Sequence, residues 1–98
     1  MGANTSFRNY PDSLGHDKIK ELWKNDVEMS LHEDGHSYSG EIGMLGTKIA
    51  SWIDLNKSQE KAYEYIETYH QKWNPALAVS FVGVKGDKYW LIGGWCSS

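Results

Sequence analysis

A His-Glu-Asp-Gly-His run at residues 32–36 has the residue types and the spacing of a zinc-binding motif. On a helix, positions i and i+4 share one face, so two imidazoles can bind one metal ion while the glutamate activates water. Glycine readily adopts the left-handed conformation that ends a helix, so Gly35 would place His32 and His36 on different faces. We therefore interpret the run as a polar helix end. A small zinc-dependent hydrolase that uses His32, Glu33 and His36 is the enzymatic alternative.

Two candidate nucleophiles lack the arrangement that catalysis requires. Ser37 directly follows His36, but adjacent residues of a strand point to opposite faces, so this closeness in sequence provides no base within hydrogen-bond reach. Cys96, two residues from the C-terminus, has no neighbouring base that would activate its thiol. We therefore predict that the protein is not an enzyme, that it has no catalytic residues and that it needs no cofactor.

Aromatic residues are the best candidates for a binding surface. Five Trp, six Tyr and two Phe are more than one small core is expected to bury. Exposed clusters of Trp and Tyr often mark the sites of binding partners. A glycine-containing strand after His36 would also leave room for a flat ligand or for the backbone of a partner. The predicted binding residues are Tyr38, Ser39, Glu41, Trp52, Tyr65, Tyr89, Trp90 and Trp95.

The charge pattern limits the classes of partner. The formal net charge is −3, and the ten Lys and Arg residues are scattered, so we predict no direct binding to duplex nucleic acid. A single cysteine permits no internal disulfide. No apolar run reaches the roughly 18 residues of a membrane span, and the polar start shows no signal peptide. The resulting prediction is a cytoplasmic protein without a membrane partner.

Hydrophobic periodicity indicates the elements of the first half of the chain. Apolar residues at helical spacing predict a helix over about residues 13–33, with Ser13 or Asp17 as its cap. The period changes to two at residues 37–44 and again at residues 48–54. These two segments are separated by a short turn, which predicts a hairpin.

The second half of the chain predicts a helix followed by another hairpin. Ser58 is a good cap for the helix, and Asn74-Pro75 would stop it. Residues 76–83 are almost continuously apolar, which is typical of a central strand that is covered on both faces. Residues 85–87 predict a turn, and residues 89–95 return as the second strand. Two adjacent glycines in this last strand indicate a bulge or a close approach to the backbone.

The order of elements is helix, hairpin, helix, hairpin, which predicts a single α+β domain over residues 1–98. Because each helix has one apolar face, we expect a four-stranded, mainly antiparallel sheet with both helices packed on one face. Residues 1–12 would form an N-terminal arm or loop. An edge strand such as residues 89–95 could pair across a homodimer.

Two segments of the chain resemble small accessory proteins that are encoded by phages and prophages. The first is His36-Ser37-Tyr38-Ser39-Gly40-Glu41-Ile42-Gly43, after an acidic helix end, and the second is Lys72-Trp73-Asn74-Pro75-Ala76-Leu77-Ala78. The resemblance would cover most of residues 16–96. It implies a protein that binds a host or anti-phage defence component, or one that sequesters a signalling nucleotide.

The leading hypothesis is a non-enzymatic phage protein that inhibits a host defence protein by protein–protein contact in the host cytoplasm. A protein that sequesters a nucleotide would need Arg or Lys residues that converge with aromatic residues. Only Arg8, Lys48, Lys85 and Lys88 are candidates for that role. Contact with a protein is therefore favoured over capture of a nucleotide.

Overall fold

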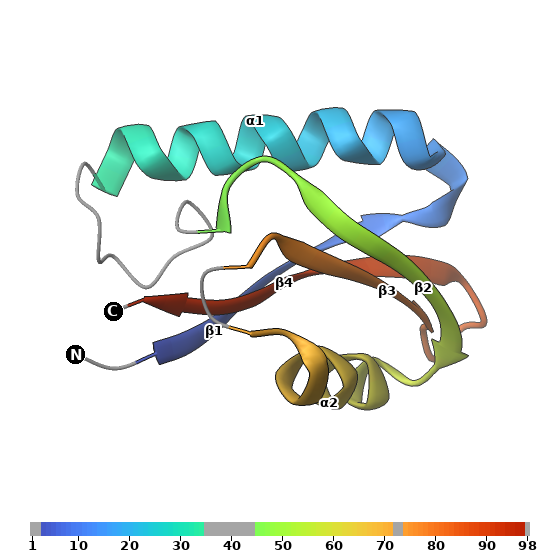
Figure 1. Ribbon diagram of the computed structural model, residues 1–98. Helices are drawn as coiled ribbons and strands as arrows, with labels where there is room; N and C mark the ends of the chain where they lie inside the picture. Colours follow the sequence, from blue (N-terminus) through green and yellow to red (C-terminus); the bar gives the residue numbers. More distant parts are fainter. Residues whose placement is uncertain (1–2, 35–44, 72–73, 98) are drawn as a thin grey trace.

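The computed structural model describes residues 3–34, 45–71 and 74–97, and it places one helix on each face of a four-stranded sheet (Figure 1). The elements in chain order are β1 (Ala3–Pro11), the 3₁₀ helix η1 (Asp12–Leu14), α1 (His16–Asp34), β2 (Ile49–Lys57), α2 (Gln59–Tyr69), β3 (Ala76–Val82) and β4 (Lys88–Ser97). The α+β class, the two helices and the β3–β4 hairpin confirm the prediction from the sequence.

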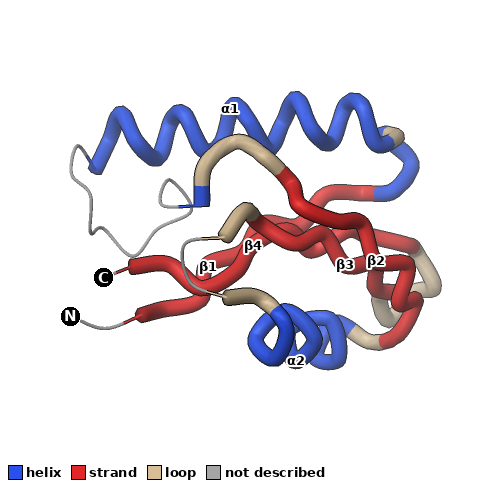
Figure 2. Tube along the Cα trace, viewed as in Figure 1, coloured by secondary structure: helices blue, strands red, loops and turns tan. Residues whose placement is uncertain are grey.

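The sheet is mixed, with the strand order β1-β4-β3-β2 (Figure 2). β4 pairs antiparallel with β1 and β3, whereas β2 pairs parallel with β3. The prediction of a mainly antiparallel sheet is therefore wrong at β2, because α2 carries the chain back so that β3 runs in the same direction as β2. The predicted strand at residues 37–44 lies outside the described residues. Residues 89–95 belong to an internal strand, so they have no open edge for the predicted homodimer pairing.

β1 occupies the place of the arm or loop that was predicted for residues 1–12. It pairs with β4 along its whole length, beginning with Ala3 opposite Ser97. Phe7 joins the apolar cluster on the α2 face of the sheet, and Tyr10 joins the cluster on the α1 face. The prediction failed because most residues of β1 are polar. Its backbone groups gain their partners from a strand at the other end of the chain.

The two glycines of β4 mark close contacts, as the sequence predicted. A Cβ atom at Gly93 would lie 2.8 Å from the Cα atom of Phe7, and one at Gly94 would lie 2.6 Å from the His70 ring. Both distances are shorter than real Cβ atoms tolerate. Glycine at the first position lets β1 approach β4, and glycine at the second leaves space for an imidazole.

The two helices cover opposite faces of the sheet, which corrects the prediction that both pack on one face (Figure 1). α1 buries Ile19, Trp23 and Val27 on one face, and α2 buries Ala62 and Ile66 on the other. Alternate residues of β3 belong to the two apolar clusters. Because β3 is apolar on both sides, each face of the sheet needs its own covering helix.

The two helices begin in different ways. Ser58 caps α2 as predicted, because its hydroxyl accepts the backbone N–H of Lys61 at 3.3 Å. α1 begins at His16, so the predicted caps are wrong: Ser13 lies in η1 and Asp17 lies inside the first turn of α1. Of the helices that the structure describes, none has the length and apolar character to cross a membrane.

Candidate functional site

The predicted binding residues do not gather at one site. Tyr38, Ser39 and Glu41 lie outside the described residues, so their placement is not tested. The other predicted residues are divided between the two faces of the sheet: Trp52 and Trp90 lie on the α1 face, Tyr65 and Tyr89 lie on the α2 face, and Trp95 lies beside the end of α2.

The zinc alternative finds no ligand set in the part of the chain that the structure describes. Among residues 3–34, 45–71 and 74–97, no three His, Cys, Asp or Glu side chains gather in a way that could hold a metal ion. His32 and Glu33 lie in the last turn of α1, and His36 lies outside the described residues. The zinc hydrolase therefore stays a prediction.

Trp52 and Trp90 form an aromatic cluster with His16 on the α1 face. The His16 ring stacks on Trp52 with 4.1 Å between the ring centroids and 13° between the planes. Trp90 meets each of the other two rings edge-on at 5.0 Å. Its indole N–H donates to Asp12 at 2.7 Å, and its side chain is buried. Trp90 therefore joins η1 to β4, and Trp52 has one ring face covered by His16.

A closed polar network beside this cluster holds the end of β2. Lys88 Nζ lies 2.9 Å from Asp54 and 5.3 Å from the centroid of Trp90. The buried Ser80 hydroxyl donates to Asp54 at 2.8 Å and accepts the backbone N–H of Asn56 at 3.0 Å. The hydrogen bonds from Lys88 and Ser80 lower the pKa of the Asp54 carboxyl. The network supports the left-handed backbone of Asn56 (φ 54°), and its groups are engaged with one another.

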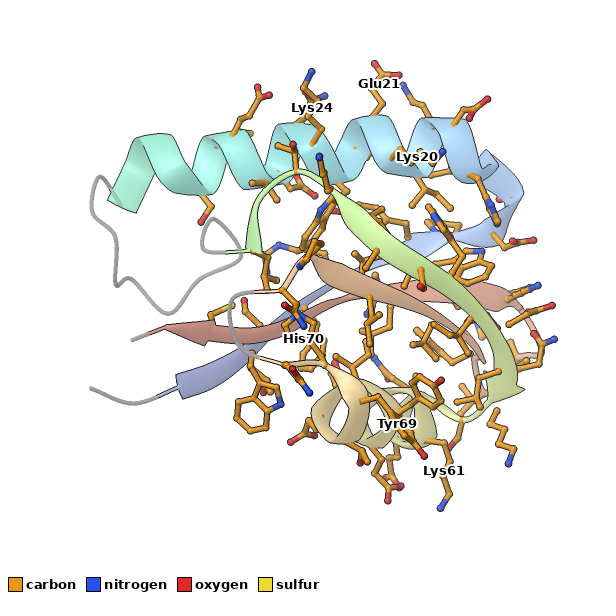
Figure 3. All side chains as sticks on the ribbon, viewed as in Figure 1. Lys20, Glu21, Lys24, Lys61, Tyr69 and His70 are labelled. Atoms are coloured by element: carbon orange, nitrogen blue, oxygen red, sulfur yellow. The ribbon has the colours of Figure 1, made fainter. Side chains whose placement is uncertain are left out.

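His70 is a second polar anchor, and the sequence did not single it out (Figure 3). The backbone N–H of Trp95 donates to Nδ1 at 3.0 Å, and Nε2 lies 3.0 Å from the carbonyl oxygens of Asn74 and Pro75. Nδ1 therefore accepts and Nε2 donates, which defines the neutral tautomer with its proton on Nε2. The Trp95 indole N–H donates to the Glu67 carbonyl at 3.0 Å. Both side chains thus attach β4 to the end of α2.

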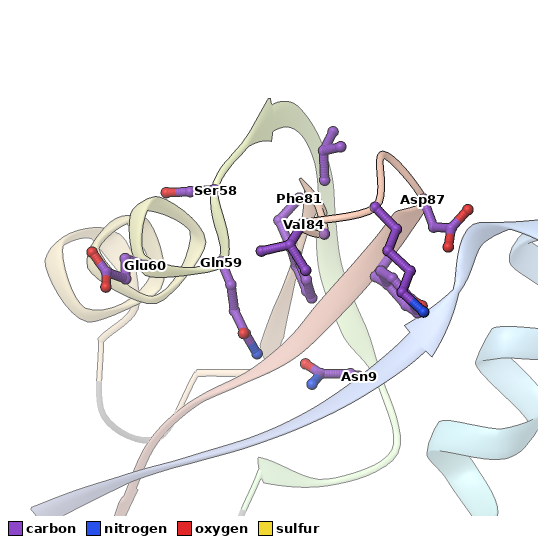
Figure 4. Close-up of a pocket in the computed structure, with 11 residues that line it drawn as sticks. Asn9, Ser58, Gln59, Glu60, Phe81, Val84 and Asp87 are labelled. Atoms are coloured by element: carbon purple, nitrogen blue, oxygen red, sulfur yellow. The ribbon is translucent and has the colours of Figure 1, made fainter.

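A groove of about 920 Å³ opens on the α2 face, between β1, the first turn of α2 and the β3–β4 hairpin (Figure 4). The rings of Phe81 and Tyr89 are stacked along it, with centroids 5.5 Å apart and 20° between the planes. Val84, on the hairpin, is fully exposed at 107%. We call this site the α2–hairpin groove and define it by Asn9, Gln59, Glu60, Phe81, Val84, Asp87 and Tyr89.

The hairpin that forms one wall of the groove is held by its own backbone. The N–H of Gly83 donates to the carbonyl of Asp87 at 2.8 Å, and the N–H of Gly86 donates to the carbonyl of Gly83 at 2.9 Å. Gly86 has φ 88°, which a residue with a side chain rarely adopts. These bonds set the shape of the turn, so the exposure of Val84 is a built feature of the hairpin.

Four exposed polar side chains that line the groove have no partner among the described residues. Asn9, Glu60, Lys85 and Asp87 make no side-chain hydrogen bond or ion pair with any residue that the structure describes. The Gln59 amide reaches only the Tyr63 hydroxyl, at 3.5 Å. Two carboxylates and one ammonium group leave the groove with a net negative charge.

The sequence predicted the turn at residues 85–87 but did not predict the groove. Asn9 and Gln59 reach it from β1 and from α2, and nothing in their local sequence brings them together. Of the predicted binding residues that the structure describes, Tyr89 alone lines it. The available signal was Val84 itself, an apolar residue between Gly83 and Lys85 at the start of the predicted turn.

No protein-family model matches the chain, and no curated protein or solved structure matches it. The resemblance to phage accessory proteins therefore stays a prediction.

Proposed function

We propose that the protein is a non-enzymatic binding protein that holds a segment of a partner protein in the α2–hairpin groove. The observation that carries the proposal is the fully exposed Val84 beside the stacked rings of Phe81 and Tyr89. Burial of a valine side chain contributes roughly 1.5 kcal/mol or more, so this surface favours an apolar group of a partner. The groove volume of about 920 Å³ is large enough to enclose several side chains.

The hairpin lowers the cost of binding because its shape is set before a partner arrives. A flexible loop would lose conformational entropy when it became ordered on the partner. The turn that carries Val84 is already ordered by the two backbone hydrogen bonds between Gly83, Gly86 and Asp87. A larger share of the contact energy therefore contributes to the free energy of binding.

The charges of the groove favour a protein segment over a nucleotide. The carboxylates of Glu60 and Asp87 would repel phosphate groups, and only Lys85 could offset them. Phe81 is 4% exposed and its ring faces that of Tyr89, which leaves little open ring surface on which a base could stack. Capture of a signalling nucleotide is thus the less favoured alternative.

The resemblance to phage accessory proteins supports a host anti-phage defence protein as the partner. A segment that is held in the groove is withdrawn from its own surface, and a defence protein that needs that segment would be inhibited. This is inhibition by contact, and it requires no chemistry from the residues of the groove.

Selection from a display library of random peptides tests the proposal. The wild-type protein is the target, and Val84→Asp is the counter-target. Met29→Asp is the matched control, because Met29 is also an exposed apolar residue (60%) but lies on α1, on the other face. We expect the enriched peptides to bind wild type and Met29→Asp equally, and Val84→Asp at least about ten-fold more weakly, a difference of about 1.4 kcal/mol.

Three outcomes would contradict the proposal. One is that no peptide is enriched, and another is that the enriched peptides bind all three proteins equally well. The third is a large rise in the melting temperature with a nucleotide, which would support nucleotide capture instead. Thermal unfolding of the two variants checks that both remain folded.

A further inference from the structure

We infer that the segment held in the α2–hairpin groove is an extended, basic peptide. Its apolar side chain would pack against the exposed Val84 and the part of the Tyr89 side chain that remains accessible, with Lys or Arg residues on either side of it. This inference rests on the proposed function, because it names the class of partner for the same groove.

Charge complementarity is the first observation that carries the inference. Glu60 on α2 and Asp87 on the hairpin lie at the two outer ends of the groove, and both carboxylates point outward, away from Phe81 (Figure 4). Neither carboxylate is paired with a described residue, so each is available to a cation of the partner. A peptide with a basic residue on each side of its apolar side chain would supply both cations. The positive charge of Lys85 would repel a third cation of the peptide.

The amide side chains are the second observation. Gln59 on α2 and Asn9 on β1 point toward one another across the groove (Figure 4). Each amide offers an acceptor oxygen and two N–H donors. The backbone of an extended peptide presents C=O and N–H groups in alternation, and such an amide pair can bond to both. A free aliphatic ammonium group or a metal ion would bind only to the oxygens of these amides and would leave their N–H donors without a partner.

Other occupants fit the same groups less well. An acidic peptide or a phosphate group would face the unpaired carboxylates of Glu60 and Asp87. A second copy of this chain could insert its own Val84, accompanied by Lys85, but it would also bring its own Asp87 beside those carboxylates. A basic segment is the occupant that satisfies the apolar surface, the amides and the charges together.

Fluorescence anisotropy with three pools of labelled short peptides tests the inference. The central positions of every pool are randomised among Leu, Ile, Val, Phe, Tyr and Trp. The flanking positions are Lys and Arg in the first pool, Ser and Gln in the second, and Asp and Glu in the third. Each pool is titrated with the wild-type protein at low and at high salt.

Two double variants with the same change in net charge locate the effect. Glu60→Gln with Asp87→Asn removes both carboxylates of the groove. Glu21→Gln with Glu28→Gln removes two carboxylates from the exposed side of α1, on the other face of the sheet. Both pairs of residues are exposed, so we expect both variants to fold.

We expect the basic pool to bind wild type at least about ten-fold more tightly than the acidic pool at low salt, with a smaller ratio at high salt. The groove double variant should lose this preference, and the α1 double variant should keep it. Peptide binding that depends on Val84 but is equally strong for the neutral or acidic pool would overturn the basic class and leave the proposed function intact. A lack of Val84-dependent binding in every pool would overturn both the basic peptide class and the proposed function. If sedimentation detects self-association of the wild type that is lost in Val84→Asp, the occupant of the groove is a second copy of this chain and not a basic partner.

Discussion

The α1 face and the α2 face of the sheet both bury apolar side chains, but the α2 face also carries a groove that is lined by exposed polar side chains. On the α1 face, Tyr10 donates to Asp26 and Trp90 donates to Asp12, whereas the buried indole N–H of Trp23 has no partner among the described residues. On the α2 face, the exposed side chains of Asn9, Glu60, Lys85 and Asp87 line the α2–hairpin groove and have no partner among the described residues. The unpaired group on the α1 face is buried, whereas those on the α2 face are exposed beside the exposed Val84.

The lengths of the helices account for this difference. α1 has 19 residues and α2 has 11, so they span about 28 Å and about 16 Å at 1.5 Å per residue. β4 has 10 residues and extends over about 33 Å. α1 can therefore follow the sheet along most of its length, whereas α2 leaves the hairpin end of its face uncovered (Figure 1). A short crossover helix is thus one way to leave an open groove on a sheet.

The largest effect that we predict is the loss of Trp23 from the α1 face. Trp23 is fully buried among α1, β3 and β4, and Trp23→Ala should lower the free energy of unfolding by about 3–5 kcal/mol. Trp23→Phe is the matched control. It keeps a ring and removes an indole N–H that has no hydrogen-bond partner among the described residues, so its loss should be clearly smaller. Urea unfolding followed by circular dichroism measures both. A loss below about 1 kcal/mol for Trp23→Ala would contradict a tightly packed α1 face.

The next effect concerns the polar anchor of the α2 face. His70→Ala should lower the free energy of unfolding by about 2–3 kcal/mol, because one buried N–H and two carbonyls lose their partner. Hydrogen exchange at the Trp95 amide should become faster. His70→Gln, which retains an acceptor and a donor, should lose less. Equal losses in the two variants, with unchanged exchange at Trp95, would show that His70 acts by its volume alone.

The pairing of Tyr10 with Asp26 predicts a dependence on alkaline pH. Burial, followed by the hydrogen bond to Asp26, raises the pKa of Tyr10 well above its ordinary value of 10.0. Above that pH the unfolded chain releases the Tyr10 proton while the folded chain retains it. The contribution to stability is therefore complete below pH 10 and is lost as the pH rises further, with a slope of up to about 1.4 kcal/mol per pH unit.

Tyr10→Phe separates this contribution from that of the other tyrosines. We expect the variant to lose about 1 kcal/mol at neutral pH, because Asp26 loses a partner, and to show a shallower decline above pH 10. Urea unfolding at a series of alkaline pH values measures both quantities. A decline as steep as that of wild type would show that Tyr10 ionises equally in the folded and unfolded chains.

The smallest effect on stability is expected at the rim of the open groove. Val84→Ser should change the free energy of unfolding by less than about 0.5 kcal/mol, because the side chain is fully exposed and packs against nothing. The same change should weaken the binding of a partner segment. Thermal unfolding and peptide binding, measured on the same sample, separate the two effects. A marked loss of stability would mean that Val84 supports the hairpin and is not held open for a partner.

Patterns within single elements were enough to predict a large part of the fold. Helical spacing and the Ser58 cap predicted the start of α2, although the helix ends at Tyr69 and not at Asn74-Pro75. The turn at residues 85–87 predicted the β3–β4 hairpin, and both features depend on neighbours along the chain. The continuous apolar run of β3 predicted a strand that is covered on both faces, which the structure confirms. That run was already inconsistent with two helices on one face. Read together with the two amphipathic helices, it favours one helix on each face.

Residue order along the chain was thus sufficient for the α+β class, the two helices and the last hairpin, since short-range periodicity and capping specify them. The strand nature of β1, the parallel pairing of β2 with β3 and the α2–hairpin groove come from contacts between distant segments. Asn9, Gln59 and Val84 meet only when β1 has paired with β4 and α2 has crossed the sheet. No local sequence pattern predicts that these three residues lie close together. The free energy that brings them together comes from strand pairing and burial, which exist only in the folded chain.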